Sequence, residues 1–241
     1  MPTPKPAVAV EPTQPAAVSP KDVAPAKAPV AVAKASVAEQ KAPEPAVLDA
    51  QTIKGRLELV AGPRQSVTPD EITEGLVYFL PTGGAPLPKP GRFTISTQSK
   101  GFTPNYLVVP VGSTVMFPNR DTVLHNVYSR TPGSSFELGT FGPGESKEVV
   151  LKKAGLVIVN CNVHSSMRAN VLVLATPYYT RPGRDGNFQL KDVPVGSGTL
   201  VFWHPRSNAG SLPIEAGRNE PVVQRLVATK ALIEAHSAAG H

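Results

Sequence analysis

The sequence predicts an all-β protein preceded by a disordered N-terminal tail. From about residue 51, short runs rich in Val, Ile, Phe and Tyr alternate with polar residues. Clusters of Gly, Pro and Asn separate these runs, and no long apolar repeat of period 3.6 appears before the last dozen residues. The dozen or so strand candidates exceed the roughly seven to nine strands of one small sandwich, so we expect two β-sandwich domains.

The first 50 residues contain 10 Pro and 14 Ala but no aromatic residue. Such a segment cannot bury enough apolar surface to offset the entropy lost on ordering, and its prolines favour extended conformations. We therefore expect residues 1–50 to form a disordered tether. A tether of this kind is typical of the stretch after a membrane anchor or signal peptide, so we expect an export signal upstream. The sequence itself contains no apolar run of the roughly 18 residues that a membrane span needs.

The strand candidates share β-branched or aromatic residues between turn signals. They are residues 53–60, 75–80, 93–97, 106–111, 113–117, 124–129, 147–151, 156–161, 169–175, 187–190, 198–203 and 222–226. Arg-Asp-Gly at 184–186 predicts a hairpin turn, and residues 229–241 form a tail that we expect to contain a short helix.

Charge and cysteine content exclude some classes of function. The formal net charge of +6 is modest, the five lysines of the first 50 residues are balanced by five acidic residues, and no arginine-rich face is interleaved with aromatic residues. Nucleic acid is therefore not an expected partner. A single cysteine excludes an internal disulfide bond.

That cysteine lies in the stretch NCNVHSSMRAN, with His164 three positions after Cys161 and Met167 three positions later. Alternation places Cys161 on the inward face at the end of its strand candidate, and it places His125 inward as well. A lone inward histidine usually satisfies its ring nitrogens with hydrogen bonds in the core. If the two strands are neighbours, however, His125 reaches the same point as the loop that carries the other three residues.

Two imidazoles, a thiolate and a thioether form a soft donor set that selects copper or zinc. A His2Cys set with a weak axial Met is the arrangement of a blue-copper electron-transfer site, whereas a thioether is a poor ligand for zinc. A hydrolase with Cys161 as nucleophile and His125 or His164 as base would need an oxyanion hole and would leave Met167 without a role. Multicopper enzymes need further histidine pairs, which the five histidines do not form. We therefore expect a protein that is not an enzyme, and a copper carrier or storage protein stays open as an alternative.

Residues 102–174 resemble the cupredoxins, the family of plastocyanin and amicyanin. The resemblance rests on the Val-Gly-Ser-Thr-Val turn, Phe-Pro-Asn, His-Asn-Val, a Gly-rich turn and the Cys loop. It implies a Greek-key sandwich with one type 1 copper per chain, bound by His125, Cys161, His164 and Met167, while Asn126 ties the two ligand loops together. It also implies a one-electron carrier, a redox partner protein and a periplasmic or exported location.

The flanking segments resemble a carboxypeptidase-regulatory-like, transthyretin-like β-sandwich, through Asp-Gly-Asn-Phe at 185–188 and the Val-Pro-Val-Gly turn that follows. The arrangement is similar to that of plastocyanin-like proteins of methylamine utilisation. We therefore expect a cupredoxin domain at 91–175, inserted in a second sandwich formed by residues 51–90 and 176–228. His204 has no sulfur-containing neighbour in the sequence, and we expect it on the surface.

Overall fold

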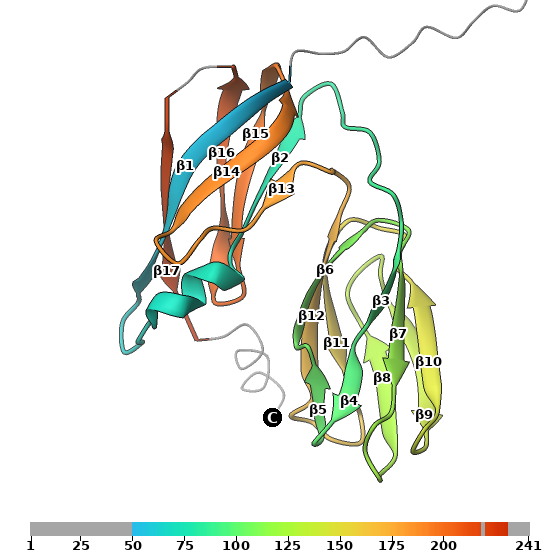
Figure 1. The fold of residues 1–241 in the computed structure, drawn as a ribbon. Coiled ribbons are helices and arrows are strands. Elements are labelled where there is room, and N and C mark those ends of the chain that lie inside the picture. Colours follow the sequence, from blue (N-terminus) through green and yellow to red (C-terminus); the bar gives the residue numbers. More distant parts are fainter. Residues whose placement is uncertain (1–49, 218–219, 231–241) are drawn as a thin grey trace, which may run out of the picture. The chain divides into compact units, whose positions relative to one another are not determined.

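The computed structural model describes residues 50–217 and 220–230, which form β-strands joined by turns and one short 3-10 helix (Figure 1). The all-β prediction is confirmed. Apart from Ala50, Thr229 and Lys230, the expected N-terminal tether and C-terminal tail lie outside the described residues. Among the described residues, no helix is both long and apolar enough to cross a membrane.

Residues 92–174 form three sheets. A five-stranded sheet has the order β6-β12-β11-β8-β9, a three-stranded sheet has the order β10-β7-β3, and β4 pairs with β5. The strands are β3 (Arg92–Thr94), β4 (Ser96–Gln98), β5 (Gly101–Thr103), β6 (Tyr106–Pro110), β7 (Thr114–Pro118), β8 (His125–Ser129), β9 (Phe136–Phe141), β10 (Ser146–Val150), β11 (Gly155–Asn160) and β12 (Arg168–Leu174). Within the five-stranded sheet, β6 and β12 run parallel and the other neighbours run antiparallel.

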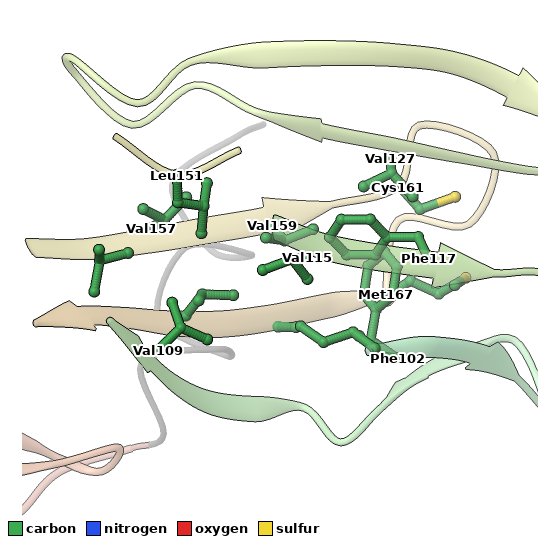
Figure 2. Close-up of a cluster of buried hydrophobic side chains, with 14 of the residues drawn as sticks. Phe102, Val109, Val115, Phe117, Val127, Leu151, Val157, Val159, Cys161 and Met167 are labelled. Atoms are coloured by element: carbon green, nitrogen blue, oxygen red, sulfur yellow. The ribbon is translucent and has the colours of Figure 1, made fainter. Parts of the chain in front are cut away.

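One hydrophobic core serves these sheets. Alternation along β11 buries Val157 and Val159, and Cys161 continues the same inward face just beyond the strand. Phe102 and Phe117 pack against each other in an edge-on arrangement, with ring centroids 6.2 Å apart. Figure 2 shows Cys161 and these two rings at one end of the cluster. The thiol is thus enclosed by packed side chains.

The flanking segments form two further sheets, ordered β14-β1-β17 and β13-β2-β15-β16. Their elements are β1 (Ala50–Ala61), η1 (Pro69–Glu74), β2 (Leu76–Pro81), β13 (Tyr179–Thr180), β14 (Asn187–Pro194), β15 (Gly196–His204), β16 (Ser207–Ala216) and β17 (Val222–Ala228). Each sheet combines strands from before and after residues 92–174. A second core lies here, with Phe79, Phe188, Leu200 and Phe202 among its buried members. The likeness of these sheets to a transthyretin-like sandwich and the domain boundaries stay predictions.

Each predicted strand overlaps an observed one, with ends that differ by a few residues. The sequence-based prediction missed strands β5, β9, β13 and β16 and the 3-10 helix. A sequence signal for that helix was present, because Thr68 and Glu71 form a capping box around Pro69.

Candidate metal centre

The four predicted ligands lie where two neighbouring strands end. His125 begins β8, Cys161 follows the last residue of β11, and His164 and Met167 lie in the turn from β11 to β12. Strands β8 and β11 are antiparallel, with Tyr128 opposite Asn160, so the residues that follow Asn160 run beside β8 towards its start at His125. The condition under which His125 reaches the cysteine loop, that the two strands are neighbours, therefore holds.

Three of these side chains converge. One ring nitrogen from each histidine and Sγ of Cys161 lie within 4.8 Å of one another. The imidazole centroids are 5.0 Å apart and the ring planes are inclined by 51°. His125 and Cys161 are buried, whereas His164 is half-buried. The cluster is thus enclosed on one side and reaches the surface through His164.

The histidine nitrogens show how a metal fits this cluster. Nε2 of His125 lies 2.8 Å from Oδ2 of Asp121. An ionised carboxylate can only accept a hydrogen bond, so Nε2 carries a proton, and in the neutral imidazole Nδ1 keeps the lone pair. Nδ1 of His125 and Nδ1 of His164 are buried and have no hydrogen-bond partner among the described residues. Buried polar atoms are rarely left unpaired, and a metal ion bound by both nitrogens and the thiolate would satisfy them.

Met167 is fully buried in the same core as Cys161. Its backbone closes the loop, because its N–H donates to the carbonyl of His164 at 3.0 Å and its carbonyl accepts the N–H of Cys161 at 3.3 Å. Figure 2 shows the sulfur-containing side chains of Cys161 and Met167 at the same end of the core. The turn therefore keeps Cys161 and Met167 close together.

Asn126 bridges the two segments that carry the donors. Its backbone N–H lies 3.4 Å from Sγ of Cys161, and its side-chain Oδ1 accepts the N–H of Asn162 at 3.4 Å. Its Nδ2 donates to Oε1 of Glu137 at 2.5 Å, and that oxygen also accepts the N–H of Gly139. The role of this bridge at a copper site, which the cupredoxin resemblance implies for Asn126, stays a prediction. No local sequence signal points to Glu137, because its contact with Asn126 arises from the pairing of β8 with β9.

Asp121 is a second residue that sequence reasoning missed. It lies in a polar turn, four positions before His125, and this spacing was the available signal. Partial burial alone would raise the pKa of its carboxyl group. Hydrogen bonds from the Lys100 N–H, the His125 ring and the Ser99 N–H outweigh burial, and they hold the pKa of Asp121 below its ordinary value. The group is therefore a carboxylate at neutral pH.

His204 does not lie on the surface, so that expectation was wrong. Its side chain is completely buried, its Nε2 lies 2.9 Å from the carbonyl oxygen of Glu71, and its Nδ1 accepts the N–H of Arg206 at 3.0 Å. The carbonyl can only accept, so both ring nitrogens are satisfied in the neutral imidazole. His204 belongs to the flanking core and takes no part in the metal cluster.

No protein-family model matches the chain, and no curated protein sequence matches it either. Solved structures of copper proteins do align with part of it. A Cu(I) form of an amicyanin mutant is 19% identical, with 34% of this chain and 82% of that chain covered and a TM-score of 0.31.

A purple cupredoxin from Nitrosopumilus maritimus is 27% identical, with 34% of this chain and 98% of that chain covered and a TM-score of 0.30. A copper-containing nitrite reductase from Thermus scotoductus SA-01 is 23% identical, with 48% of this chain covered and a TM-score of 0.33. The alignment covers 28% of the nitrite reductase chain. The structural neighbours named here are thus cupredoxins, and they align with less than half of this chain.

Proposed function

We propose that the protein binds one type 1 copper ion and acts as a one-electron carrier. The observation that carries this proposal is the meeting of a buried thiol with two buried imidazole nitrogens that have no hydrogen-bond partner in the described part of the chain. His125, Cys161 and His164 would bind the ion, and Met167 would be the weak axial ligand. Bound copper would supply a centre that cycles between Cu(II) and Cu(I).

The protein's own residues would keep the centre nearly unchanged between the two oxidation states. His125 and Cys161 lie at the ends of packed strands, and the hydrogen bonds of Met167 hold the loop between the strands closed. Fixed donors need little reorganisation when one electron is gained or lost. The Asn126 N–H, which points at Sγ, lowers the electron density on the thiolate.

His164 would be the route by which the electron leaves. It is half-buried, whereas His125 and Cys161 are buried, so a redox partner protein would approach closest to the centre on this side. We propose that the protein is not an enzyme, because Cys161 is 3% exposed and its thiol is poorly accessible as a nucleophile. A copper carrier that exchanges its ion is the second candidate, and the burial of Cys161 disfavours it.

Addition of Cu(II) to the purified full-length chain tests the proposal. We expect an intense blue colour from thiolate-to-copper charge transfer, and we expect Cys161→Ser to abolish it. Ala169→Ser is the matched control, because it adds a hydroxyl group to the same core at a buried position on β12. A colourless Cu(II) complex, or a colour that persists in Cys161→Ser, would refute type 1 copper. The rate of electron self-exchange is then compared with the rate at which copper is lost to a chelator. Fast self-exchange with slow copper loss would favour an electron carrier over a copper carrier.

We also propose a periplasmic or exported location, which the Pro/Ala-rich first 50 residues support as a tether of the kind that follows an export signal or anchor. Cell fractionation of the natural host, together with the coding sequence upstream of Met1, tests this part of the proposal. Recovery of the protein in the cytoplasmic fraction would contradict it.

A further inference from the structure

We propose that Asp121 is a positioning residue that fixes the imidazole of His125 for metal binding and favours Cu(II) over Cu(I). This inference rests on the proposed copper site. The side chain of His125 is completely buried and that of Asp121 is 15% exposed, so their contact is largely shielded from water. A hydrogen bond to a charged acceptor is among the stronger ones in proteins.

The carboxylate selects the ring tautomer of His125. Because Oδ2 accepts the proton on Nε2, the lone pair lies on Nδ1, the ring atom that has no partner. A histidine that binds a metal usually donates its other N–H to such a partner, which fixes the ring orientation and raises the basicity of the ligand. In this site the acceptor carries a full negative charge.

Asp121 is itself held in place by a strained hairpin turn. Oδ1 accepts the N–H of Ser99 at 2.6 Å, and Oδ2 accepts the N–H of Lys100 at 2.9 Å. These two residues join β4 to β5, and both have positive φ, 53° and 54°. Two positive φ values in a two-residue hairpin loop are typical of a type I′ turn, which prefers Asn-Gly. Ser99 and Lys100 are not the preferred residues of such a turn, and the two hydrogen bonds to the carboxylate stabilise it.

The backbone of Asp121 is anchored as well. Its N–H donates to Oδ1 of Asn119 at 3.0 Å, and the same oxygen accepts the hydroxyl of Thr97 at 3.0 Å. Thr97 and Asn119 are both buried. The carboxylate thus has a fixed position relative to His125, and a fixed charge beside a ligand stabilises the more highly charged ion, Cu(II).

Two substitutions at Asp121 separate charge from position. Asp121→Asn keeps an oxygen that can accept from Nε2 but removes the charge, whereas Asp121→Ala removes the acceptor. Both are made in the chain with Ser99→Asn and Lys100→Gly, which supply the preferred residues of the turn so that it no longer needs the carboxylate. Asp185→Asn and Asp185→Ala are matched controls, because that carboxylate accepts the N–H of Asn187 in another turn and makes no contact with the metal cluster.

The first readout needs no metal. Nitrogen NMR of the apo-protein at neutral pH should show His125 with its proton on Nε2 alone. In Asp121→Ala the form with the proton on Nδ1 should appear as a second population, while His164 in the same spectrum should stay unchanged. A single unchanged tautomer of His125 in Asp121→Ala would overturn the positioning role.

The second readout is the ratio of Cu(II) to Cu(I) affinity. Loss of a partner that supports a metal ligand typically costs about 10- to 100-fold in affinity. We expect the blue colour to persist in Asp121→Asn and the affinity ratio to fall about tenfold, which raises the potential of a one-electron couple by about 59 mV. A change below twofold, or an equal change in Asp185→Asn, would overturn the tuning role. If the parent chain does not turn blue with Cu(II), the proposed function fails, and the apo-protein spectra still decide whether Asp121 positions His125.

Discussion

The backbone N–H of Asn126 points at Sγ of Cys161 at 3.4 Å. The side chain of Asn126 also accepts the N–H of Asn162, so one residue contacts the thiol and the loop that follows it. Asn126 is next to His125 in the chain. The position of the His125 ring is therefore coupled to that of the Cys161 thiol through a single residue.

Replacement of Asn126 by Ala should weaken this coupling. A buried hydrogen-bonding group that loses its partner costs about 1–3 kcal/mol, so we expect the free energy of unfolding to fall by about that amount. Copper should also be lost faster to a chelator. Chemical denaturation and chelator kinetics measure the two effects. Asn187→Ala is the control, because its amide pairs with Asp185 on the exposed surface and its loss should change stability little. Equal effects of both substitutions would contradict the coupling.

Replacement of Met167 by Leu should leave the blue colour in place, because the colour arises from the thiolate. Leu has a similar volume, so we expect a loss of stability below about 1.5 kcal/mol. Without the thioether, the reduction potential should rise. Spectroelectrochemistry measures this change, and Met116→Leu, on β7 of the three-stranded sheet, is the control. A potential that stays the same in both variants would show that Met167 is not an axial ligand.

Copper removal should lower stability by mass action, because the two imidazole nitrogens and the thiol meet only in the folded chain. A ligand present at 100 times its dissociation constant stabilises a protein by about 2.7 kcal/mol. Melting temperatures of the apo- and copper-loaded protein should therefore differ, and the difference should increase with copper concentration. In Cys161→Ser we expect copper to raise the melting temperature much less. An increase as large as in the parent protein would show that copper binds elsewhere.

The flanking sheets should lose stability in mild acid because of His204. Burial lowers the pKa of His204 below its ordinary value of 6.5. The unfolded chain then binds more protons than the folded one, so the contribution of His204 is complete above about pH 6.5 and falls as the pH drops towards the folded pKa. Denaturation between pH 7 and 5 should show this loss. In His204→Gln, whose side chain cannot be protonated in this range, the free energy of unfolding should change less with pH. An unchanged pH dependence would show that other groups cause the loss of stability.

Gly198 in β15 should not accept a side chain. A Cβ atom added there would lie 2.2 Å from a ring carbon of Phe79 and 2.7 Å from the carbonyl oxygen of Leu80. Overpacking of a core costs about 1–3 kcal/mol, and we expect Gly198→Ala to lower the free energy of unfolding by this amount. At Gly83 an added Cβ meets nothing within 4 Å, so Gly83→Ala should be tolerated. Thermal melting of the two variants checks the contrast.

The sequence predicts well those strands whose inward residues are β-branched or aromatic, such as β11. The four strands that were missed all lie at sheet edges, although other edge strands, such as β6 and β10, were predicted. Strand β16 contains Gly210 and Pro213, which argue against a strand, yet β16 pairs on one side only, where a missing N–H is tolerated. Strand β9 is also an edge strand and contains Gly139 with a φ of 72°. A local pattern does not reveal which strands lie at an edge.

In the candidate site, too, local sequence predicts some residues, whereas others depend on contacts between distant parts of the chain. His125, Cys161, His164 and Met167 could be proposed from residue type and alternation, because metal ligands need particular atoms at the ends of strands. Asp121 offered only its spacing of four positions from His125, and the contacts that hold its carboxylate come from the Ser99–Lys100 turn, which local sequence does not bring near it. His204 was misplaced for a similar reason, because its partner Glu71 lies 133 positions away in the sequence.

The interleaving of the flanking strands imposes an order on folding during synthesis. Strand β1 pairs with β14 and β17, and β2 pairs with β13 and β15, so neither has its partners when it leaves the ribosome. All strands of the region between them are made before β13. Phe79 and Tyr178, on either side of that region, are joined by a backbone hydrogen bond of 2.9 Å. Pairing of β2 with β13 closes a loop that contains residues 92–174. If these residues have already folded, the effective length of the loop is only about the distance between the two ends of the folded region. The entropic cost of closing the loop is then lower. Residues 92–174 would then act as a template on which the surrounding sheets are completed.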